Sequence, residues 1–316
     1  MQAHGEKCDI LELGWKSLKE ENHQIRWSAN VCLTVAMIVF VISSATRNYS
    51  QVDKIWSIMP VVYCWIVVTD SRTLIMAIVA TVWGVRLTWN FYRRGGYKWP
   101  PWDGDEDYRW KYIQDGFHLS ILKNSVVWTL FNFGFISGYQ NILLWLIVSP
   151  AMVVHIIAAS PDCDSSPLNA YDLIAVNLFL MMVFVESIAD NQQYAFQTEK
   201  HRLMSEKKLL VGDYADGFCK SGLFSILRKP NYAAEQALWA SFYIFSFAAF
   251  QGRRWWNPSA IGCALLVQLF SASGPFTEKI SMSKYPKYKD YKNEVPLYWP
   301  NPFRLFGMKK KKTHRS

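Results

Sequence analysis

Long apolar stretches constrain this chain more than any other feature of its sequence. The first, at about 29–46, runs without a single charged residue. A helix needs about 20 apolar residues to cross a bilayer core about 30 Å thick, and inside lipid each backbone amide needs an internal partner, which a helix provides. Six further candidates follow at about 54–69, 72–91, 122–159, 170–190, 233–250 and 257–277. The sequence therefore predicts an all-α polytopic membrane protein with about seven transmembrane helices.

One of these candidates is too long for a single straight crossing. Residues 122–159 exceed the length of one span at 1.5 Å per residue. They predict either one tilted helix that bends near Pro150, or an interfacial segment followed by a span. With this stretch included, the expected organisation is a polar N-terminal segment at 1–28, a seven-helix domain at 29–280 and a basic tail at 281–316.

The composition agrees with a membrane protein that has short loops. Hydrophobic residues make up 51% of the chain and charged residues only 19%. The net charge of +9 is concentrated in a few loops and in the tail, a distribution that favours topology and anionic lipid over nucleic acid as its cause. We therefore expect membrane lipids as partners, no nucleic acid and no obligate protein partner.

The cysteines and the N-terminus carry little further signal. The six cysteines show no CxxC spacing and no paired histidines, so the sequence predicts neither a metal site nor a disulfide framework. The segment before the first apolar stretch is too charged for a cleaved signal peptide.

Basic residues predict the orientation of the spans. Five lysines and arginines lie in the loop between the third and fourth spans, seven lie between the fifth and sixth, and more follow the seventh, whereas residues 160–169 contain none. Because cytoplasmic loops are rich in lysine and arginine, the N-terminus is expected outside and the C-terminus in the cytosol. The pair Arg253 and Arg254 on the outer side is an exception.

The cytosolic end of the fifth span carries acidic side chains. Glu186 and Asp190 are four residues apart and therefore share one helix face, which Gln193 and Gln197 continue. Ionisable residues inside a span are functional candidates because their desolvation is costly. The same residues also fit a helix end that already lies among lipid headgroups, where charges cost little. Both interpretations remain open.

A second polar cluster, GLFSILRKPNYAAE at 222–235, stands before the sixth span. Gly222 permits a turn, and Pro230 suits the first turn of a helix, where its missing N–H costs nothing. Asn231 and Glu235 again share one helix face. Arg228 precedes a helix N-terminus that already favours anions, so the stretch predicts a phosphate site. A cytoplasmic anchor that touches lipid phosphate fits the same residues equally well.

A third cluster follows the seventh span. Glu278 lies at the cytosolic end of the span, and Tyr285, Tyr288 and Tyr291 recur every three residues among lysines. Tyrosines in this pattern can cover a nucleotide or lie at the membrane interface as an aromatic belt.

Taken in order, these motifs resemble a known family. WGVRLTWNFYRRGG, EDYRW, ESIADNQQYAFQ, GLFSILRKPNYAAEQALW and EKISMSKYPKYKDYKNEVP are similar to the DUF1295 branch of the steroid 5-alpha-reductase-like family, over about residues 51–303. The RxPNYxxE motif and the tyrosine-rich tail are shared with sterol C14 and C7 reductases and with isoprenylcysteine carboxyl methyltransferases. The acidic end of the fifth span favours the reductase branch.

The resemblance implies a seven-helix enzyme that reduces a carbon–carbon double bond with NADPH as cofactor. Asp190, Asn231 and Glu235 match positions at which the family contacts NADPH, and Arg228 and Tyr232 are their neighbours. Three further cofactor-binding candidates are less closely matched. Glu186 stands where steroid reductases place an amide, Glu278 replaces a tyrosine, and Tyr288 comes from the tail pattern.

The residues that would protonate the substrate depart from the family pattern. Steroid 5-alpha-reductases use a glutamate in the second span and a tyrosine in the third, whereas this chain has no carboxylate near Pro60 and has Trp83 at the tyrosine position. Asp53 and Tyr63 are the available substitutes as catalytic acids. A desolvated aspartic acid can stay protonated and donate a hydrogen bond, although Asp53 also suits a helix cap.

Together these features predict an integral, multi-pass oxidoreductase of lipid metabolism, located in the endoplasmic reticulum if the organism is eukaryotic. Its substrate would be an enone in a steroid, sterol or other lipid. The resemblance also implies that Arg93, Arg94 and Arg109 are candidates for the 2′-phosphate of NADPH. Two alternatives stay open at this point. One is an S-adenosylmethionine-dependent methyltransferase of the isoprenylcysteine type, although this chain has Lys229 where those enzymes usually have a histidine. The other is a catalytically silent lipid-binding membrane protein.

Overall fold

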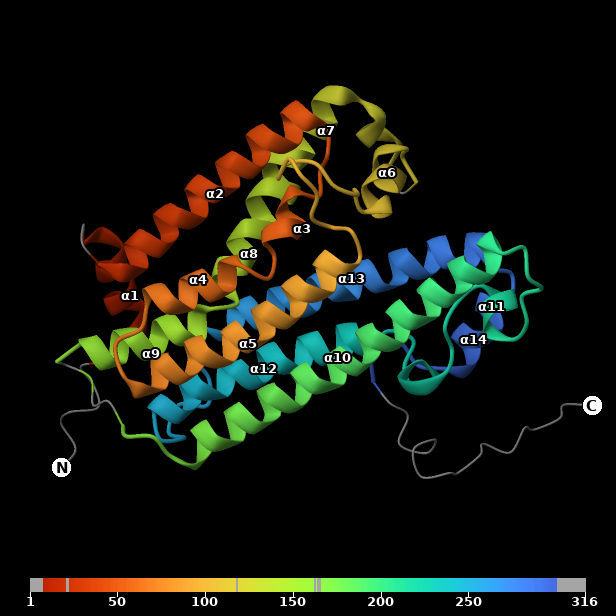
Figure 1. Cartoon of the computed structure of the whole chain (residues 1–316). Helices are drawn as coiled ribbons and strands as arrows, with labels where there is room; N and C mark the ends of the chain where they lie inside the picture. The colour runs from red at the N-terminus through yellow and green to blue at the C-terminus, as the bar shows by residue number, and fades with distance from the viewer. Residues whose placement is uncertain (1–7, 21–22, 118, 162, 164–165, 300–316) are drawn as a thin grey trace, which may run out of the picture. The chain divides into compact units, whose positions relative to one another are not determined.

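The computed structural model describes residues 8–20, 23–117, 119–161, 163 and 166–299, and in these residues the chain is helical without any β-strand (Figure 1). The α-helices are α1 (Ile10–Lys19), α2 (Gln24–Thr46), α3 (Gln51–Ile55), α4 (Met59–Ile66), α5 (Ser71–Arg93), α6 (Tyr108–Gln114), α7 (Ser125–Phe131), α8 (Gln140–Leu146), α9 (Ser149–Ala159), α10 (Ala170–Ser205), α11 (Asp213–Asp216), α12 (Pro230–Ala249), α13 (Ala260–Lys284) and α14 (Tyr288–Glu294). The short turns η1 (Ser120–Lys123) and η3 (Gly222–Ser225) are 3₁₀-helical, and η2 (Asn132–Tyr139) is π-helical.

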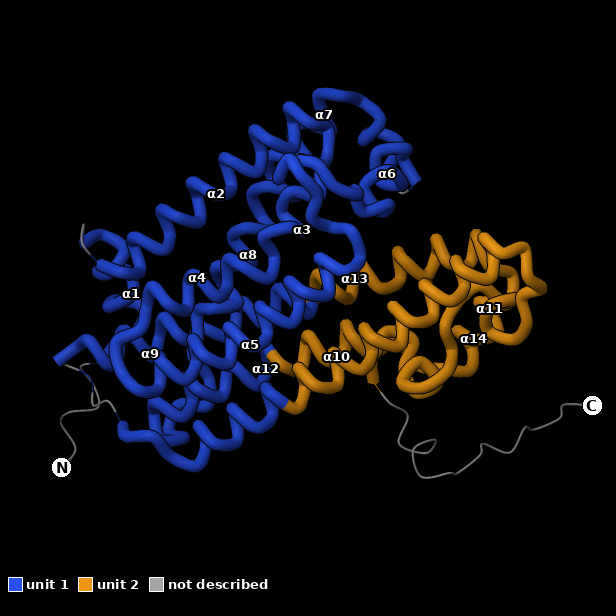
Figure 2. The backbone as a smooth tube through the Cα atoms, in the orientation of Figure 1, with its two compact units in different colours: residues 1–180, 239–267 blue, residues 181–238, 268–316 orange. Residues whose placement is uncertain are grey.

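The chain forms two compact units (Figure 2). Unit 1 comprises residues 1–180 and 239–267, and unit 2 comprises residues 181–238 and 268–316. The boundaries fall inside α10, α12 and α13, so each unit contains parts of these three helices. The end of the basic tail, from residue 300, lies outside the described residues, as do residues 1–7 of the polar N-terminal segment.

Four described helices are long and apolar enough to cross a membrane, namely α2, α5, α10 and α13, and a bent helix pair makes a fifth. These correspond to the first, third, fifth, seventh and fourth spans expected from the sequence. The second expected span is broken into α3 and α4, of five and eight residues. The sixth is α12, a helix of 20 residues rich in aromatic side chains. The protein is therefore an all-helical membrane protein with four or five candidate spans by length and composition.

The bent pair resolves the over-long stretch at 122–159. Residues Ser125–Leu146 and Ser149–Ala159 meet at an angle of 47°. The break immediately precedes Pro150, which occupies the first turn of α9 and lacks the N–H that would continue the preceding helix. The bend expected near Pro150 is confirmed, and the crossing of the membrane by this pair stays a prediction.

Unit 1 has an aromatic core between its long helices. Trp83 of α5 and Trp239 of α12 are fully buried and pack edge to face, with ring centroids 4.9 Å apart. Small residues allow close approach around this core. A Cβ on Gly84 would lie 2.6 Å from the carbonyl oxygen of Ser57, and one on Gly262 would lie 1.9 Å from that of Leu146. These glycines therefore set the contacts of α5 with the α3–α4 junction and of α13 with α8.

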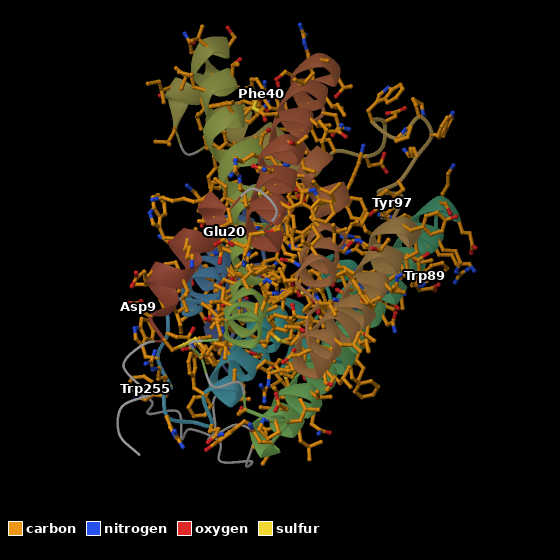
Figure 3. The ribbon with its side chains drawn as sticks, turned by 90° about the vertical axis from the view of Figure 1, so that its left-hand side faces the viewer. Asp9, Glu20, Phe40, Trp89, Tyr97 and Trp255 are labelled. Atoms are coloured by element: carbon orange, nitrogen blue, oxygen red, sulfur yellow. A yellow bond between two sulfur atoms is a disulfide. The ribbon has the colours of Figure 1, made fainter. Side chains whose placement is uncertain are left out.

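A disulfide joins Cys8, before α1, to Cys163, in the segment before α10. The expectation of no disulfide framework was wrong, because a pairing across 155 residues leaves no local spacing signal and depends on tertiary placement. At the same end of unit 1, the Arg254 guanidinium donates to the Cys8 carbonyl at 3.0 Å. Figure 3 shows the nearby Asp9 and Trp255 on this side of the unit.

A second segment of unit 1 is held by a dense set of hydrogen bonds. Residues 48–54, around α3, bind the loop at 97–107 that follows α5. The Asn48 amide donates to the Gly104 carbonyl at 3.0 Å, and the Gln51 amide donates to the Trp102 carbonyl at 2.8 Å. The Glu106 carboxylate accepts from the Tyr49 backbone N–H at 2.6 Å. We call this set of contacts the α3 clamp.

Unit 2 has its own small core at the end of α13. Phe218, Tyr288, Tyr291 and Val295 are buried together. The Tyr291 hydroxyl donates to the Phe224 carbonyl at 2.5 Å, which ties α14 to η3. The tyrosines of the tail therefore form a packed aromatic cluster, because α14 turns their side chains toward Phe218.

Candidate functional site

The acidic row on α10 and the start of α12 meet inside unit 2. Glu186 and Asp190 are buried on α10, at 4% and 7% exposure, and Glu235 is buried on α12. The Asn231 side-chain amide donates to the Asp190 carboxylate at 3.3 Å. Helical spacing explains the geometry, because Glu186 and Asp190 share one face of α10 as Asn231 and Glu235 share one face of α12. The structure thus brings together the residues that two separate sequence motifs suggested.

The turn before α12 forms as its residues predict. Gly222 has φ +60°, which is the left-handed region that glycine adopts without steric cost. Its position also lies tight against Gln192 of α10, where a Cβ would come within 2.4 Å of the side-chain nitrogen. The Gln192 carbonyl oxygen in turn accepts from the Leu223 N–H at 2.9 Å. Pro230 is the first residue of α12, as expected.

The first turn of α12 offers hydrogen-bond donors and a cation. No acceptor is found among the described residues for the backbone N–H groups of Asn231 and Tyr232, whereas that of Ala233 donates to the Lys229 carbonyl. The Lys229 ammonium lies 5.5 Å from the centre of the Tyr232 ring. A helix N-terminus with free N–H groups and an adjacent cation attracts anions. This end of α12 can therefore hold a phosphate.

Arg228, in contrast, is committed to an internal ion pair. Its guanidinium binds both carboxylate oxygens of Glu278 and donates to the Lys292 carbonyl at 2.9 Å and to the Val295 carbonyl. Arg228 is 8% exposed and Glu278 1%. The Tyr288 hydroxyl also donates to Glu278, at 3.3 Å. These three sequence-predicted residues hold α12, α13 and the segment after α14 together, and their direct contact with a cofactor stays a prediction.

Burial also changes the protonation of Tyr288 beside the Arg228–Glu278 pair. Removal from water raises the pKa of Tyr288, and the nearby Glu278 carboxylate adds to the effect, because both disfavour a phenolate. The Tyr288 phenol therefore stays protonated at neutral pH and can donate a hydrogen bond.

Asp53 lies in unit 1, within the α3 clamp. Its carboxylate oxygen Oδ2 is buried and has no hydrogen-bond partner in the described residues. The pKa of Asp53 is raised to about 6, chiefly by burial and then by the neighbouring Asp107 carboxylate, against the opposing effect of Arg109. Asp53 does not cap α3, because α3 begins two residues earlier at Gln51. It is a carboxyl group that exchanges its proton near neutral pH.

Tyr63, the other candidate acid, is fully buried on α4. Its hydroxyl has no hydrogen-bond partner that meets normal geometry in the described part of the chain. A buried hydroxyl without a partner is costly and is therefore a candidate for ligand contact. No hydrogen bond joins Tyr63 to Asp53 among the described residues.

The candidate arginines of the third loop are held by local partners. The Arg109 guanidinium pairs with Asp107 at 2.8 Å. The Arg93 guanidinium donates to the Asn90 side chain at 2.8 and 3.0 Å. Arg94 is exposed at the end of α5. Their proposed contact with a 2′-phosphate stays a prediction.

Comparison with known proteins agrees with the motif order found in the sequence. The family described as "Protein of unknown function (DUF1295)" matches residues 39–295. The chain belongs to the DUF1295 family. An uncharacterised protein of Schizosaccharomyces pombe is 32% identical to it over 278 residues, which cover 83% of this chain and 76% of the yeast protein. No solved structure matches the chain.

The match to DUF1295 includes both parts of the α10–α12 site, since Glu186 and Glu235 fall inside its limits. Within this DUF1295 protein, the structure also reveals residues that sequence reasoning missed. Gln192 supports the turn before α12, although the acidic row had suggested Gln193 and Gln197. Arg72 and Asp172 form a buried pair with a contact of 2.7 Å at the starts of α5 and α10. Their only sequence signal was a charge at the edge of each apolar stretch.

Proposed function

We propose that this DUF1295 protein is a membrane-embedded, NADPH-dependent reductase of a carbon–carbon double bond in a lipid. The observation that carries the proposal is the hydrogen bond between Asn231 and Asp190, which unites the α10 acidic row with the start of α12. Two helices that present buried carboxylates and an amide to each other form a polar site, which an apolar membrane protein does not need for its stability alone.

The chemistry of the side chains fits NADPH. Glu186, Asp190 and Glu235 supply acceptors for ribose hydroxyls and for the nicotinamide NH₂ group. The N–H groups of the first turn of α12 and the Lys229 ammonium supply donors for phosphate. S-adenosylmethionine carries no phosphate, so this end of the site favours a dinucleotide over the methyl donor.

In such a reaction NADPH supplies a hydride to the β-carbon of an enone. The protein's part is to hold the reacting groups and to stabilise the negative charge that develops on the substrate oxygen. Two groups, both in unit 1, are alternative candidates for that task. The Tyr63 hydroxyl can donate a hydrogen bond without loss of an existing one, and Asp53 can donate a proton because its pKa of about 6 keeps part of it protonated at neutral pH. Arg228 and Glu278 would act as positioning residues, since they fix the approach to α12.

The proposed topology places the cofactor site in the cytosol. We propose seven crossings, with α12 and the α3–α4 stretch as the two that length and composition alone do not identify. The distribution of lysine and arginine supports an outer N-terminus and a cytosolic C-terminus. In a eukaryotic cell we place the protein in the endoplasmic reticulum, where lipid enzymes of this kind would meet cytosolic NADPH.

Thermal unfolding of the detergent-solubilised protein tests the cofactor assignment. A ligand at 100 times its dissociation constant stabilises the folded state by about 2.7 kcal/mol. We expect NADPH to raise the unfolding midpoint and S-adenosylmethionine to leave it unchanged. The opposite result would identify a methyltransferase, and no shift with either compound would favour a silent lipid-binding protein.

Variants then locate the bound nucleotide. Asp190→Ala and Asn231→Ala should abolish the NADPH-dependent shift, because each removes one partner of the bond between α10 and α12. Asn177→Ala is the matched control, since Asn177 is an exposed residue of α10 whose side chain only bonds back to the Leu173 carbonyl. A shift that survives in both site variants would overturn the site assignment.

A further inference from the structure

The N-terminal helix α1 carries more apolar surface than its packing on unit 1 covers. Ile10 is buried, and a Cβ on Gly14 would lie 3.7 Å from the Ile156 side chain, so this face of α1 rests on α9. Leu11, in contrast, is 68% exposed, and Trp15 is 62% exposed. These two large apolar side chains therefore lie on the outer side of the helix.

The outer side of α1 divides into two strips, because successive residues of a helix are about 100° apart. One strip, which we call the apolar strip, is about 60° wide. It contains Leu11, Trp15 and the partly buried Leu18. The adjacent strip contains three exposed charged residues, Glu12, Lys16 and Lys19. An apolar strip beside a charged one is the pattern of a helix that lies along a membrane interface.

Both ends of α1 are attached to the unit, which fixes the direction of the apolar strip. The disulfide between Cys8 and Cys163 holds the chain just before the helix. At the other end, the Arg26 guanidinium of α2 donates to the Lys19 carbonyl at 2.7 Å. A helix of 10 residues is about 15 Å long, so α1 is too short to cross a bilayer core about 30 Å thick.

The start of α2 marks the level of the membrane surface beside α1. Helix α2 is a candidate span that begins at Gln24, shortly after α1 ends. Trp27, in its first turn, is exposed. An exposed tryptophan at the end of a span is typical of the membrane–water interface. Because Arg26 of the same turn binds the end of α1, the apolar strip lies close to that level.

A second exposed aromatic segment is attached to α1 at this end of the unit. Trp255 and Trp256 follow α12 and are 72% and 68% exposed. The Arg254 guanidinium donates to the Cys8 carbonyl at 3.0 Å, which holds this segment beside the start of α1. Figure 3 shows Asp9, the N-cap of α1, and Trp255 on the same side of the unit. Two segments far apart in the sequence thus present tryptophan at one end of unit 1.

The charges beside the apolar strip suit phospholipid headgroups. The Lys19 ammonium lies 4.8 Å from the centre of the Trp15 ring. A lysine in this position lays its apolar stem along the ring and keeps its ammonium among phosphates. Glu12, on the same charged strip as Lys16, has the opposite sign. The strip therefore fits a zwitterionic headgroup layer and requires no anionic lipid.

We propose that α1 is an interfacial helix, whose apolar strip lies with Trp255 and Trp256 in the headgroup layer of the bilayer at this end of unit 1. The partner of this surface is the phospholipid leaflet, rather than a second copy of the chain or another protein. This placement depends neither on NADPH nor on which face of the membrane is cytosolic.

Spin-labelled cysteine variants of the full-length protein in phosphatidylcholine nanodiscs test this placement. All variants carry Cys263→Ser, because Cys263 is partly exposed whereas Cys32, Cys64 and Cys219 are buried. Leu11→Cys lies on the apolar strip, and its matched control Glu12→Cys lies on the charged one. Collisions of each nitroxide are measured with oxygen, which dissolves in lipid, and with a nickel(II) chelate, which stays in water.

We expect the ratio of oxygen to nickel collisions to be at least about threefold higher at Leu11→Cys than at Glu12→Cys, because an interfacial helix buries its apolar face about 5–10 Å deep. Trp15→Cys and Lys16→Cys should repeat this difference. On the second segment, Trp255→Cys should likewise exceed Arg253→Cys, since Arg253 is an exposed cation of the same loop.

Two outcomes would refute the proposal. Equal ratios within these pairs would place α1 and the tryptophan segment in water. Protection of the Leu11→Cys and Trp15→Cys nitroxides from both reagents would show that a protein surface covers the apolar strip.

Discussion

Asp53 combines burial with a neighbouring carboxylate, and this gives the folded protein a measurable dependence on pH. Its pKa of about 6 lies above the ordinary 3.8. The protonated form is thus favoured by folding, so the stabilisation is complete below pH 3.8 and is lost as the pH rises through 6. Burial opposes ionisation of Asp107, but its pKa is lowered by Arg109, so that residue titrates below this window.

We expect the wild-type protein to lose about 1–1.5 kcal/mol of unfolding free energy through Asp53 between pH 5 and pH 7.5. Asp53→Asn should abolish that part of the pH dependence, because an amide stays neutral throughout. Thermal unfolding at the two pH values measures the difference. Asp105→Asn is the control, since Asp105 is an exposed partner of Lys98 on the loop that the α3 clamp holds. An unchanged pH slope in Asp53→Asn would contradict the assignment.

At the scale of the helices, the Arg228–Glu278 pair holds the start of α12 against α13. Glu278→Ala leaves the Arg228 guanidinium buried without its carboxylate, and such a loss typically costs about 3–5 kcal/mol. The double variant Arg228→Met with Glu278→Leu should be more stable than Glu278→Ala, because no buried charge remains unpaired. Thermal unfolding and limited proteolysis of unit 2 compare the two variants.

The control for this pair is Glu206→Ala, which removes an exposed partner of Arg202 on α10. Exposed ion pairs contribute little, so its unfolding midpoint should hardly move. If Glu278→Ala behaved like Glu206→Ala, the pair would not hold the site together.

The sequence predicted local features of these helices better than their pairing. Pro230 at the start of α12 and Gly222 in the preceding turn followed from backbone restrictions on proline and glycine. The hydrogen bond between Asp190 and Asn231 could be predicted only in part, because the sequence placed each residue on a polar helix face but did not pair the two faces. Arg228 and Glu278 are 50 residues apart, and no periodicity links them. The break between α3 and α4 could not be predicted from the sequence either, because the apolar pattern continues across it.

At the scale of the whole molecule, the proposed orientation predicts which residues face the cytosol. Ser205 is exposed at the end of α10, on the side that should be cytosolic. In sealed vesicles with the cytosolic face outward, a membrane-impermeant maleimide should label Ser205→Cys directly. Cys8 and Cys163 should react only after reduction and permeabilisation. Labelling of Ser205→Cys that required permeabilisation would reverse the topology.

The disulfide also sets a parity rule for the path of the chain through the bilayer. A bond between side chains cannot span a membrane, so the chain crosses an even number of times between Cys8 and Cys163. The contact of Arg254 with Cys8 extends the rule to residue 254. The α3 clamp likewise keeps residues 48–54 and 97–107 on one side, which requires a second crossing besides α5 between them.

That second crossing falls on the stretch that contains α4. Between Cys8 and Cys163, α2, the α4 stretch and α5 make three crossings, so an even total requires one more from the bent pair. Between Cys163 and Arg254 the chain contains α10 and α12, so both of these helices cross if either does. If the four candidate helices α2, α5, α10 and α13 all cross, the smallest path that obeys these contacts has the seven crossings that we propose and leaves the two ends of the chain on opposite faces. One covalent bond and a few carbonyl contacts thus support the proposed number of crossings without any appeal to the distribution of charge, which alone assigns the two faces.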